Sequence, residues 1–158
     1  MIHVVSISDL KIADKKEDVL ITYSLGSCIG VTLYDKASGI GGMLHALLPQ
    51  SKMNPQRAEQ NPFMFVDSGF SRMLDEFKRR GANPQKLICK VAGGGKFLDP
   101  NDVFKTGERN YTILRKMLWK NRILIAGEDV GGTIPRTMVL YMASGKTAIR
   151  SGGKEKLL

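Results

Sequence analysis

The residues best suited to catalysis lie close together in the first third of the chain. Cys28 follows Gly26 and Ser27, two small residues that permit a tight turn between two apolar segments. His45 lies in a later apolar segment and is one of only two histidines in the chain. A thiol becomes a strong nucleophile when a base such as imidazole removes its proton. The two residues therefore indicate nucleophilic catalysis, with Cys28 as the nucleophile and His45 as the base.

Thr22 and the turn itself could supply the remaining groups of such a site. The Thr22 hydroxyl, at the end of the preceding apolar segment, could orient the far imidazole nitrogen of His45. Backbone N–H groups around Gly26 and Ser27 could hold an oxyanion, and Gly26 could adopt a positive φ. A purely structural interpretation stands beside this one, because a cysteine or histidine within an apolar strand is commonly a core residue. The spacing alone leaves both interpretations open.

No other motif in the sequence indicates bound metal or cofactor. The two cysteines and two histidines are scattered, without a Cys-x-x-Cys pair, so no metal site is expected. The glycine run at residues 93–95 precedes Lys96 but lacks the spacing of a phosphate-binding loop. We interpret it as a closely packed transition from a strand to a loop. Cys89 lies within an apolar strand and is expected to be a small core residue.

Size and composition are typical of a globular domain. The 158 residues fit one domain, residues 1–158, around a single core. No apolar run approaches the roughly 20 residues that span a bilayer, and the first residues lack a secretory signal pattern. No membrane insertion is therefore expected. Two cysteines are too few for a disulfide framework, which favours a cytoplasmic location.

The charge of the chain favours an acidic partner. The formal net charge is +9, which would speed encounter with either nucleic acid or an acidic protein. Basic residues are spread along the chain, and aromatic residues make up only 7% of it, so nucleic-acid binding is not expected. Phe97 and Phe104 could anchor a protein partner, although core packing explains them equally well.

The order of the apolar segments predicts an α+β fold. Strand patterns occur at residues 2–7, 19–23, 29–34, 40–49, 87–92, 122–126, 136–142 and 146–150. Helices are predicted to begin near residues 61 and 106. The polar residues 9–18 predict a loop with a short ordered piece, and residues 50–61 predict an exposed loop that could act as a lid or a plain connection. Residues 151–158 predict a frayed tail. Together they predict a layered α/β/α sandwich, with a mixed, largely antiparallel sheet covered by helices.

Five blocks of the sequence resemble the CheD family of chemoreceptor glutamine deamidases. The blocks are residues 25–31, 42–49, 93–94, 107–110 and 128–132. Their order and spacing make the resemblance more specific than any single block, and it extends from the first predicted strand to about residue 150. The chain departs from the family pattern at Gly95, where alanine is frequent, and around Pro135, where a basic or small residue is common. Neither position is one of the three candidate catalytic residues.

The resemblance implies a function as well as a fold. It implies that Cys28, His45 and Thr22 are catalytic, in a layered α/β/α domain similar to those of deamidating bacterial toxins. The implied reaction is hydrolysis of glutamine side-chain amides in methyl-accepting chemoreceptors, through a thioester and without metal or cofactor. A second implied partner is a CheC-type phosphatase, whose action on the response regulator CheY the family stimulates. The alternative function is a non-catalytic regulatory binding module of the chemotaxis system.

Overall fold

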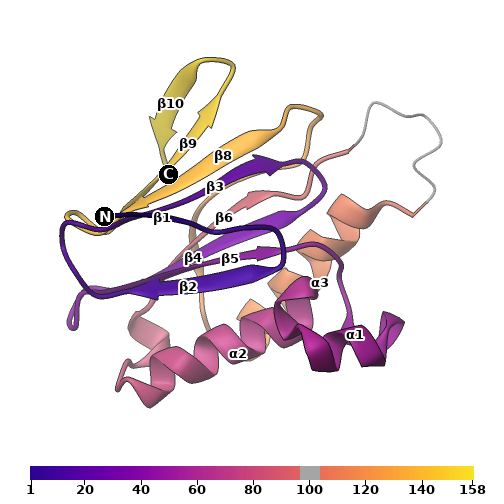
Figure 1. Cartoon of the computed structure of the whole chain (residues 1–158), viewed down its shortest axis with the longest axis horizontal. Helices are drawn as coiled ribbons and strands as arrows, with labels where there is room; N and C mark the ends of the chain where they lie inside the picture. The colour runs from indigo at the N-terminus through magenta and orange to yellow at the C-terminus, as the bar shows by residue number, and fades with distance from the viewer. Residues whose placement is uncertain (97–103) are drawn as a thin grey trace.

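The computed structural model describes residues 1–96 and 104–158, and within them the strands form two five-stranded sheets (Figure 1). The first sheet contains, in spatial order, β1 (Ile2–Val4), β3 (Val19–Leu25), β8 (Arg136–Tyr141), β9 (Lys146–Ser151) and β10 (Lys154–Leu157). The second sheet contains β2 (Asp9–Ala13), β5 (Ile40–Ala46), β4 (Ile29–Asp35), β6 (Ile88–Gly93) and β7 (Ile125–Val130). Each sheet has one parallel pair, β1 with β3 and β6 with β7. The other pairs are antiparallel.

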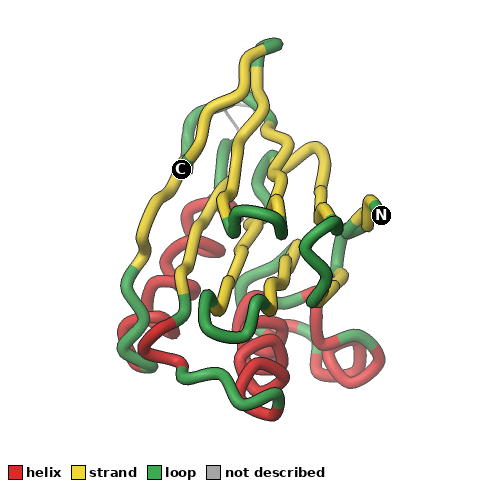
Figure 2. The backbone as a smooth tube through the Cα atoms, turned by 90° about the vertical axis from the view of Figure 1, so that its left-hand side faces the viewer, coloured by secondary structure: helices red, strands yellow, loops and turns green. Residues whose placement is uncertain are grey.

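The helices lie on one side of the second sheet, and the first sheet lies on its other side (Figures 1 and 2). The α-helices of the described chain are α1 (Pro55–Gln60), α2 (Val66–Arg79) and α3 (Thr106–Lys120). On α2, the apolar stripe predicted from three- and four-residue spacing is buried and packs in the core beneath the helices: Val66, Phe70, Met73, Leu74 and Phe77. The second sheet is thus the central layer of the molecule.

Strand β4 is the middle strand of the second sheet, and its side chains alternate between two cores. Ile29 and Leu33 pack in the core beneath the helices. Gly30 and Thr32 face the first sheet, where Thr32 Oγ1 lies 2.8 Å from Thr147 Oγ1 of β9. Cys28 lies just before β4 and continues this alternation. Its side chain therefore faces the space between the two sheets.

The predicted α+β class with mixed sheets is confirmed, but the layers differ from the predicted α/β/α order. The strands divide into two sheets, so the order is helices, second sheet, first sheet. The first sheet buries the inner face of the second one with apolar side chains such as Leu20, Met138 and Ile149. A second helical layer is not needed to cover that face, because the first sheet already removes it from water.

The predicted frayed tail, residues 151–158, is wrong. Residues Lys154–Leu157 form β10, which pairs antiparallel with β9. Gly152 and Gly153 connect the two strands with φ angles of 56° and 76°. A two-residue hairpin loop of this kind requires positive φ at both positions, and glycine adopts it without steric cost. The Gly-Gly pair was therefore a hairpin signal in the sequence.

Two segments predicted as loops contain regular structure. Residues 9–13 form β2, paired with β5, because Leu10 and Ile12 alternate with more polar residues and pack against the core beneath the helices. Within residues 50–61, a 3-10 turn is followed by α1, whose amino terminus is capped by the Asn54 side chain. No helix in the described ranges combines the length and apolarity that crossing a membrane requires.

Candidate functional site

Cys28, just before β4, and His45, on the neighbouring strand β5, project toward the same space between the sheets. His45 pairs with Gly30 in the β4–β5 ladder, and Cys28 lies two residues before Gly30 on the same face of the chain. The two residues are therefore diagonal neighbours, whose Cα atoms in such a ladder lie roughly 7–8 Å apart. Both are buried, with only 7% of Cys28 and 1% of His45 exposed. The ladder brings together the two residues predicted to react.

Thr22 reaches His45 from the opposite sheet and fixes which imidazole nitrogen carries the proton. The Thr22 Oγ1 atom lies 2.7 Å from His45 Nδ1. The same hydroxyl donates its proton to the Val5 carbonyl at 2.6 Å. A hydroxyl has only one proton, so Thr22 must accept a hydrogen bond from Nδ1–H. The proton on Nδ1 leaves the lone pair of the neutral ring on Nε2, which is buried without a hydrogen-bond partner among the described residues.

Burial favours the uncharged forms of both Cys28 and His45. Burial lowers the pKa of His45 to about 4, and the Asp9 carboxylate partly opposes this shift. Burial also raises the pKa of the Cys28 thiol above its usual value, against the smaller effect of a hydrogen bond from its own backbone N–H. At neutral pH the pair is therefore a thiol beside a neutral imidazole. A neutral imidazole with a free lone pair is able to accept a proton, which is the property that a general base requires.

The turn at residues 26–28 is held by the glycine run at residues 93–95, which begins with the last residue of β6. Gly95 N–H donates to the Gly26 carbonyl and Gly94 N–H donates to the Cys28 carbonyl, both at 2.8 Å. Gly93 has φ 98°, and a Cβ atom there would lie 2.3 Å from the Cys28 carbonyl oxygen. The expected close-packed transition is confirmed, and it fixes the backbone that carries the thiol.

Gly26 does not supply the left-handed residue of this segment. That conformation belongs to Ser24, with φ 57°, where the β3–β8 ladder is interrupted. The Ser24 carbonyl accepts a hydrogen bond from Gly26 N–H at 2.9 Å. A Cβ atom at Gly26 would meet no atom within 4 Å, so its side of the turn is open. Ser27, by contrast, is buried.

Two buried or partly buried polar residues near the site were missed from the sequence. Asp9 pairs directly with His45 in the β2–β5 ladder. The alternation that places it in a strand was present in the sequence, but residues 9–18 were interpreted as a loop with only a short ordered piece. Asn110 on α3 is fully buried, and its side chain donates to the Ser27 carbonyl. It lies in one of the five matched blocks, yet no role had been given to it.

Cys89, the second free cysteine, lies in the core and not in the candidate site. Cys89 is fully buried in the core beneath the helices, and this burial raises the pKa of its thiol to about 12. The prediction that Cys89 is a core residue is confirmed. In the described part of the chain, no cluster of three or more histidine, cysteine or acidic side chains could hold a metal ion.

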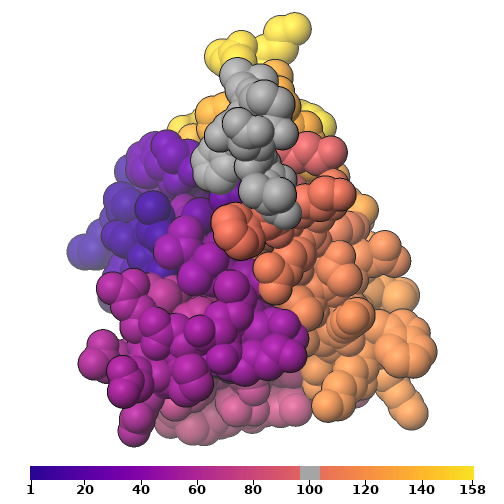
Figure 3. Space-filling view, turned by 90° about the vertical axis from the view of Figure 1, so that its right-hand side faces the viewer, coloured from indigo at the N-terminus to yellow at the C-terminus, as the bar shows by residue number. Residues whose placement is uncertain are grey.

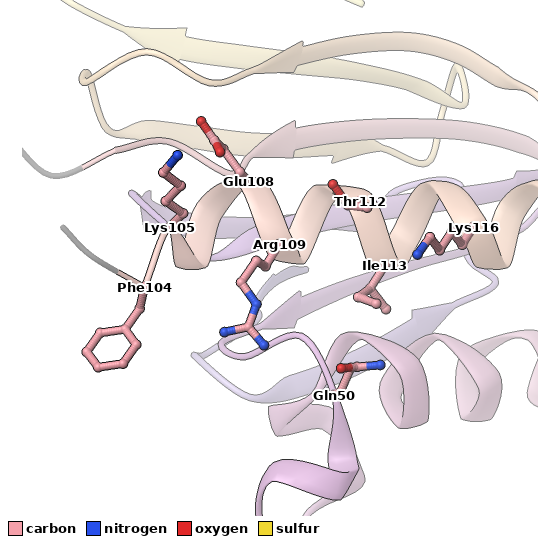
Figure 4. Close-up of a pocket in the computed structure, with 8 residues that line it drawn as sticks. All are labelled: Gln50, Phe104, Lys105, Glu108, Arg109, Thr112, Ile113 and Lys116. Atoms are coloured by element: carbon pink, nitrogen blue, oxygen red, sulfur yellow. The ribbon is translucent and has the colours of Figure 1, made fainter.

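An open groove of about 550 Å³ lies outside the site, on the outer face of α3. Figure 4 shows the residues that line it: Gln50, Phe104, Lys105, Glu108, Arg109, Thr112, Ile113 and Lys116. The segment around Gln50 and α3 meet on the face drawn in Figure 3, where they are magenta and orange. Phe104 is 73% exposed, so it is not a core residue. Phe97 lies outside the described residues.

The stacked sheets with helices on one outer face define a class of α+β fold that is found in a solved structure. The hypothetical protein YfiH of Bacillus licheniformis aligns with a TM-score of 0.51 over 77% of this chain. The alignment covers 49% of that protein, so this chain spans about half its length. The sequences are 16% identical, and the similarity is therefore one of fold.

The chain belongs to the CheD family. The family model described as CheD chemotactic sensory transduction matches residues 47–151. A protein of Solibacter usitatus named "Probable chemoreceptor glutamine deamidase CheD" is 47% identical over 98% of this chain and 92% of its own length. A similarly named protein of Syntrophus aciditrophicus is 41% identical over 95% and 94%. One from Thermococcus kodakarensis is 36% identical over 98% and 95%. The resemblance seen in the sequence is thus confirmed at the level of the family.

Proposed function

We propose that this protein is a protein-glutamine deamidase that converts glutamine side chains of chemoreceptors to glutamate, with release of ammonia. The observation that carries the proposal is the 2.7 Å contact between Thr22 Oγ1 and His45 Nδ1. It assigns a free lone pair to Nε2 of a histidine that shares a strand face with Cys28. The names of the family members support the choice of substrate. The reaction would take place in the cytoplasm, where both cysteines can remain free thiols.

In the first half of the reaction, Cys28 attacks the carboxamide carbon of the substrate glutamine. His45 Nε2 takes the thiol proton as the Sγ–C bond forms, so the buried thiol and imidazole become charged only as the new bond develops. The carboxamide oxygen becomes an oxyanion, for which the Ser27 and Cys28 N–H groups of the turn would be the donors, since Gly26 N–H already donates to the Ser24 carbonyl. His45 then passes its proton to the leaving nitrogen, the C–N bond breaks, and ammonia departs. A γ-glutamyl thioester remains on Cys28.

In the second half, water hydrolyses the thioester. His45 Nε2 removes a proton from the water as its oxygen attacks the thioester carbon. The C–S bond then breaks, the sulfur takes the proton back from His45, and glutamate is released. Throughout the cycle, Thr22 keeps Nδ1 protonated and stabilises the imidazolium that forms twice. The cycle requires only water as a co-reactant, and each proton that His45 accepts is returned.

The proposal includes a second partner, a CheC-type phosphatase that the protein would regulate. The exposed Phe104 and the basic groove along α3 offer a surface for a protein of opposite charge (Figure 4). The alternative function, a purely regulatory binding module, needs this surface but not the thiol. The alternative predicts that Cys28→Ala leaves phosphatase stimulation intact and that no ammonia is released by the wild-type protein.

The experiment that tests the deamidase is a continuous assay of ammonia release from a receptor cytoplasmic fragment. We expect Cys28→Ala and His45→Ala each to lower kcat by at least about a thousandfold, because nucleophile and base act as a unit. Cys89→Ala serves as the matched control, since it removes the other thiol and leaves the proposed site untouched. An equal loss in Cys89→Ala, or turnover that persists in Cys28→Ala, would refute the proposal.

A further inference from the structure

Asn110 connects the backbone just before the proposed nucleophile, Cys28, with the backbone just after β5, the strand that carries the proposed base, His45. It lies on α3 and is fully buried. Its Nδ2 atom donates to the Ser27 carbonyl at 2.9 Å and to the Leu47 carbonyl at 3.1 Å. Ser27 directly precedes Cys28, and Leu47 follows His45 by two residues. A single side chain thus joins the backbone on either side of the site.

The orientation of the Asn110 amide follows from its partners. Both contacts are to carbonyl oxygens, which only accept hydrogen bonds, so the NH₂ group must face them. Its Oδ1 atom is buried without a partner among the residues that the structure describes. Burying an acceptor without a hydrogen-bond partner is unfavourable, because the desolvation of that acceptor is not compensated. A side chain that serves stability alone would be expected to satisfy both ends, and Asn110 satisfies only the end that faces the site.

The Ser27 carbonyl is half of the peptide group whose other half is the Cys28 N–H. The peptide bonds of the described chain are trans, so the carbonyl and the N–H of one planar group point in opposite directions. By holding the carbonyl, Asn110 turns the Cys28 N–H away from α3. That N–H is also the group that hydrogen-bonds the Cys28 sulfur and opposes the rise in its pKa.

The neighbouring peptide groups are held separately. Gly95 and Gly94 donate to the carbonyls of Gly26 and Cys28, and these glycines pack against the first turn of α3. A Cβ atom on Gly107 of α3 would lie 2.1 Å from the Gly95 carbonyl oxygen. Of the three carbonyls in the turn, those of Gly26 and Cys28 are held by backbone N–H groups. The Ser27 carbonyl is held by the side chain of Asn110, which a substitution can remove.

We propose that Asn110 is a positioning residue that orients the Cys28 N–H toward the reacting sulfur and the substrate oxyanion. The proposal rests on the proposed deamidase function for the oxyanion, whereas the orientation of the N–H toward the thiol does not depend on it. Asn110 does not touch the reacting atoms itself. It acts through the Ser27–Cys28 peptide, and its link to Leu47 keeps that peptide in register with the strand of His45.

The test measures the Cys28 thiol directly, through the pH dependence of its alkylation by iodoacetamide in the full-length protein. Peptide mass spectrometry separates Cys28 from Cys89. His45 shares the strand face of Cys28, and Asp9 faces His45 across the β2–β5 ladder, so both stay unchanged in every variant. In Asn110→Ala the peptide is released and the thiolate loses its N–H donor. We expect the apparent pKa of Cys28 to rise by about 0.5–1 unit.

A matched control separates positioning from loss of stability. Leu118→Ala removes a buried leucine from the core, eight residues further along α3 than Asn110. We expect it to lower the Tm without moving the alkylation profile. Asn110→Ser keeps one hydrogen-bond donor at the position. If Asn110→Ala does not fold, the alkylation profile is measured on Asn110→Ser instead. In Asn110→Ser the apparent pKa of Cys28 should also rise, but by less than in Asn110→Ala.

Turnover of a receptor fragment supplies the second measurement. We expect Asn110→Ala to lower kcat by about 10- to 100-fold with KM within about twofold, because an oxyanion donor acts in the transition state. An unchanged alkylation profile in the folded variants, or an equal shift in Leu118→Ala, would overturn the positioning role. If the shift occurs but the wild-type protein releases no ammonia, the role of Asn110 at the thiol stands and the deamidase function is refuted.

Discussion

The Thr22 hydroxyl donates to the Val5 carbonyl and accepts from His45 Nδ1–H, and this dual role determines which nitrogen can act as a base. In Thr22→Val the ring loses its orienting partner and the Val5 carbonyl loses its donor. We expect kcat for ammonia release to fall about 10- to 100-fold, with little change in KM. Thr22→Ser retains the hydroxyl and is expected to keep most of the activity. Equal losses in the two variants would contradict the assignment.

The pH profile of the reaction should reflect the buried state of His45. Burial lowers the pKa of His45 to about 4, so the ring stays neutral and competent as a base well below pH 6.5. We expect the acid limb of kcat/KM to fall near pH 4–5. In Asp9→Asn the opposing carboxylate is removed, the pKa of His45 falls further, and this limb moves to lower pH. An acid limb near pH 6.5 that does not respond to Asp9→Asn would contradict this electrostatic account.

The same lowered pKa predicts how stability depends on pH. Between pH 6.5 and about 4 the unfolded chain protonates His45 while the folded chain does not, so acid favours unfolding. Stability should therefore be lost as the pH falls through this window, by up to about 3 kcal/mol, and this contribution should level off below pH 4. Urea unfolding at several pH values measures the loss. We expect His45→Gln to flatten the dependence, and an unaltered slope in that variant would count against the buried neutral ring.

At the scale of elements, the end of β6 and the turn before β4 should respond differently to a glycine-to-alanine substitution. Gly93→Ala would place a Cβ atom against the Cys28 carbonyl at a φ of 98°, so we expect more than about 2 kcal/mol of destabilisation. Gly26→Ala meets no atom, and we expect its stability to stay within about 1 kcal/mol of wild type. Its methyl group would enter the open side of the turn, so kcat/KM should fall. Thermal unfolding and turnover measure both, and equal destabilisation would contradict the described packing.

Residues were predicted correctly where local sequence patterns identify them, and were missed where their contacts join distant parts of the chain. Cys28, His45 and Thr22 were identified as a set because strand patterns, turn residues and the family resemblance place them at strand ends. Asn110 was not given a role, since its contacts to Ser27 and Leu47 span 83 and 63 residues and no local pattern encodes them. The catalytic roles themselves stay predictions until turnover is measured.

The division into two sheets was missed for a similar reason. Most of the apolar strands were recognised, but alternation within a strand does not say which strands become its neighbours. Pairing of β3 with β8 joins residues near 20 to residues near 140, which only the folded chain reveals. The errors in residues 9–13 and 154–157 were local ones, because the alternation in the first and the Gly-Gly turn before the second were present in the sequence.

At the scale of the whole molecule, the net charge of +9 predicts an effect of salt on encounter with an acidic protein substrate. We expect kcat/KM for an intact receptor fragment to fall as ionic strength rises through the physiological range, because screening weakens long-range attraction. A short uncharged glutamine peptide should show little salt dependence and is the control. The same decline with both substrates would indicate an effect of salt on the site rather than on encounter.

The most direct test of the central claim is site-resolved mass spectrometry of a receptor cytoplasmic fragment incubated with wild-type protein, Cys28→Ala or Cys89→Ala. The account predicts that particular receptor glutamines gain almost one dalton, as amide becomes acid, with wild type and Cys89→Ala. It predicts no such gain with Cys28→Ala. Conversion of the same glutamines by Cys28→Ala, or their persistence with wild type, would contradict the claim that the Cys28 thiol deamidates chemoreceptors.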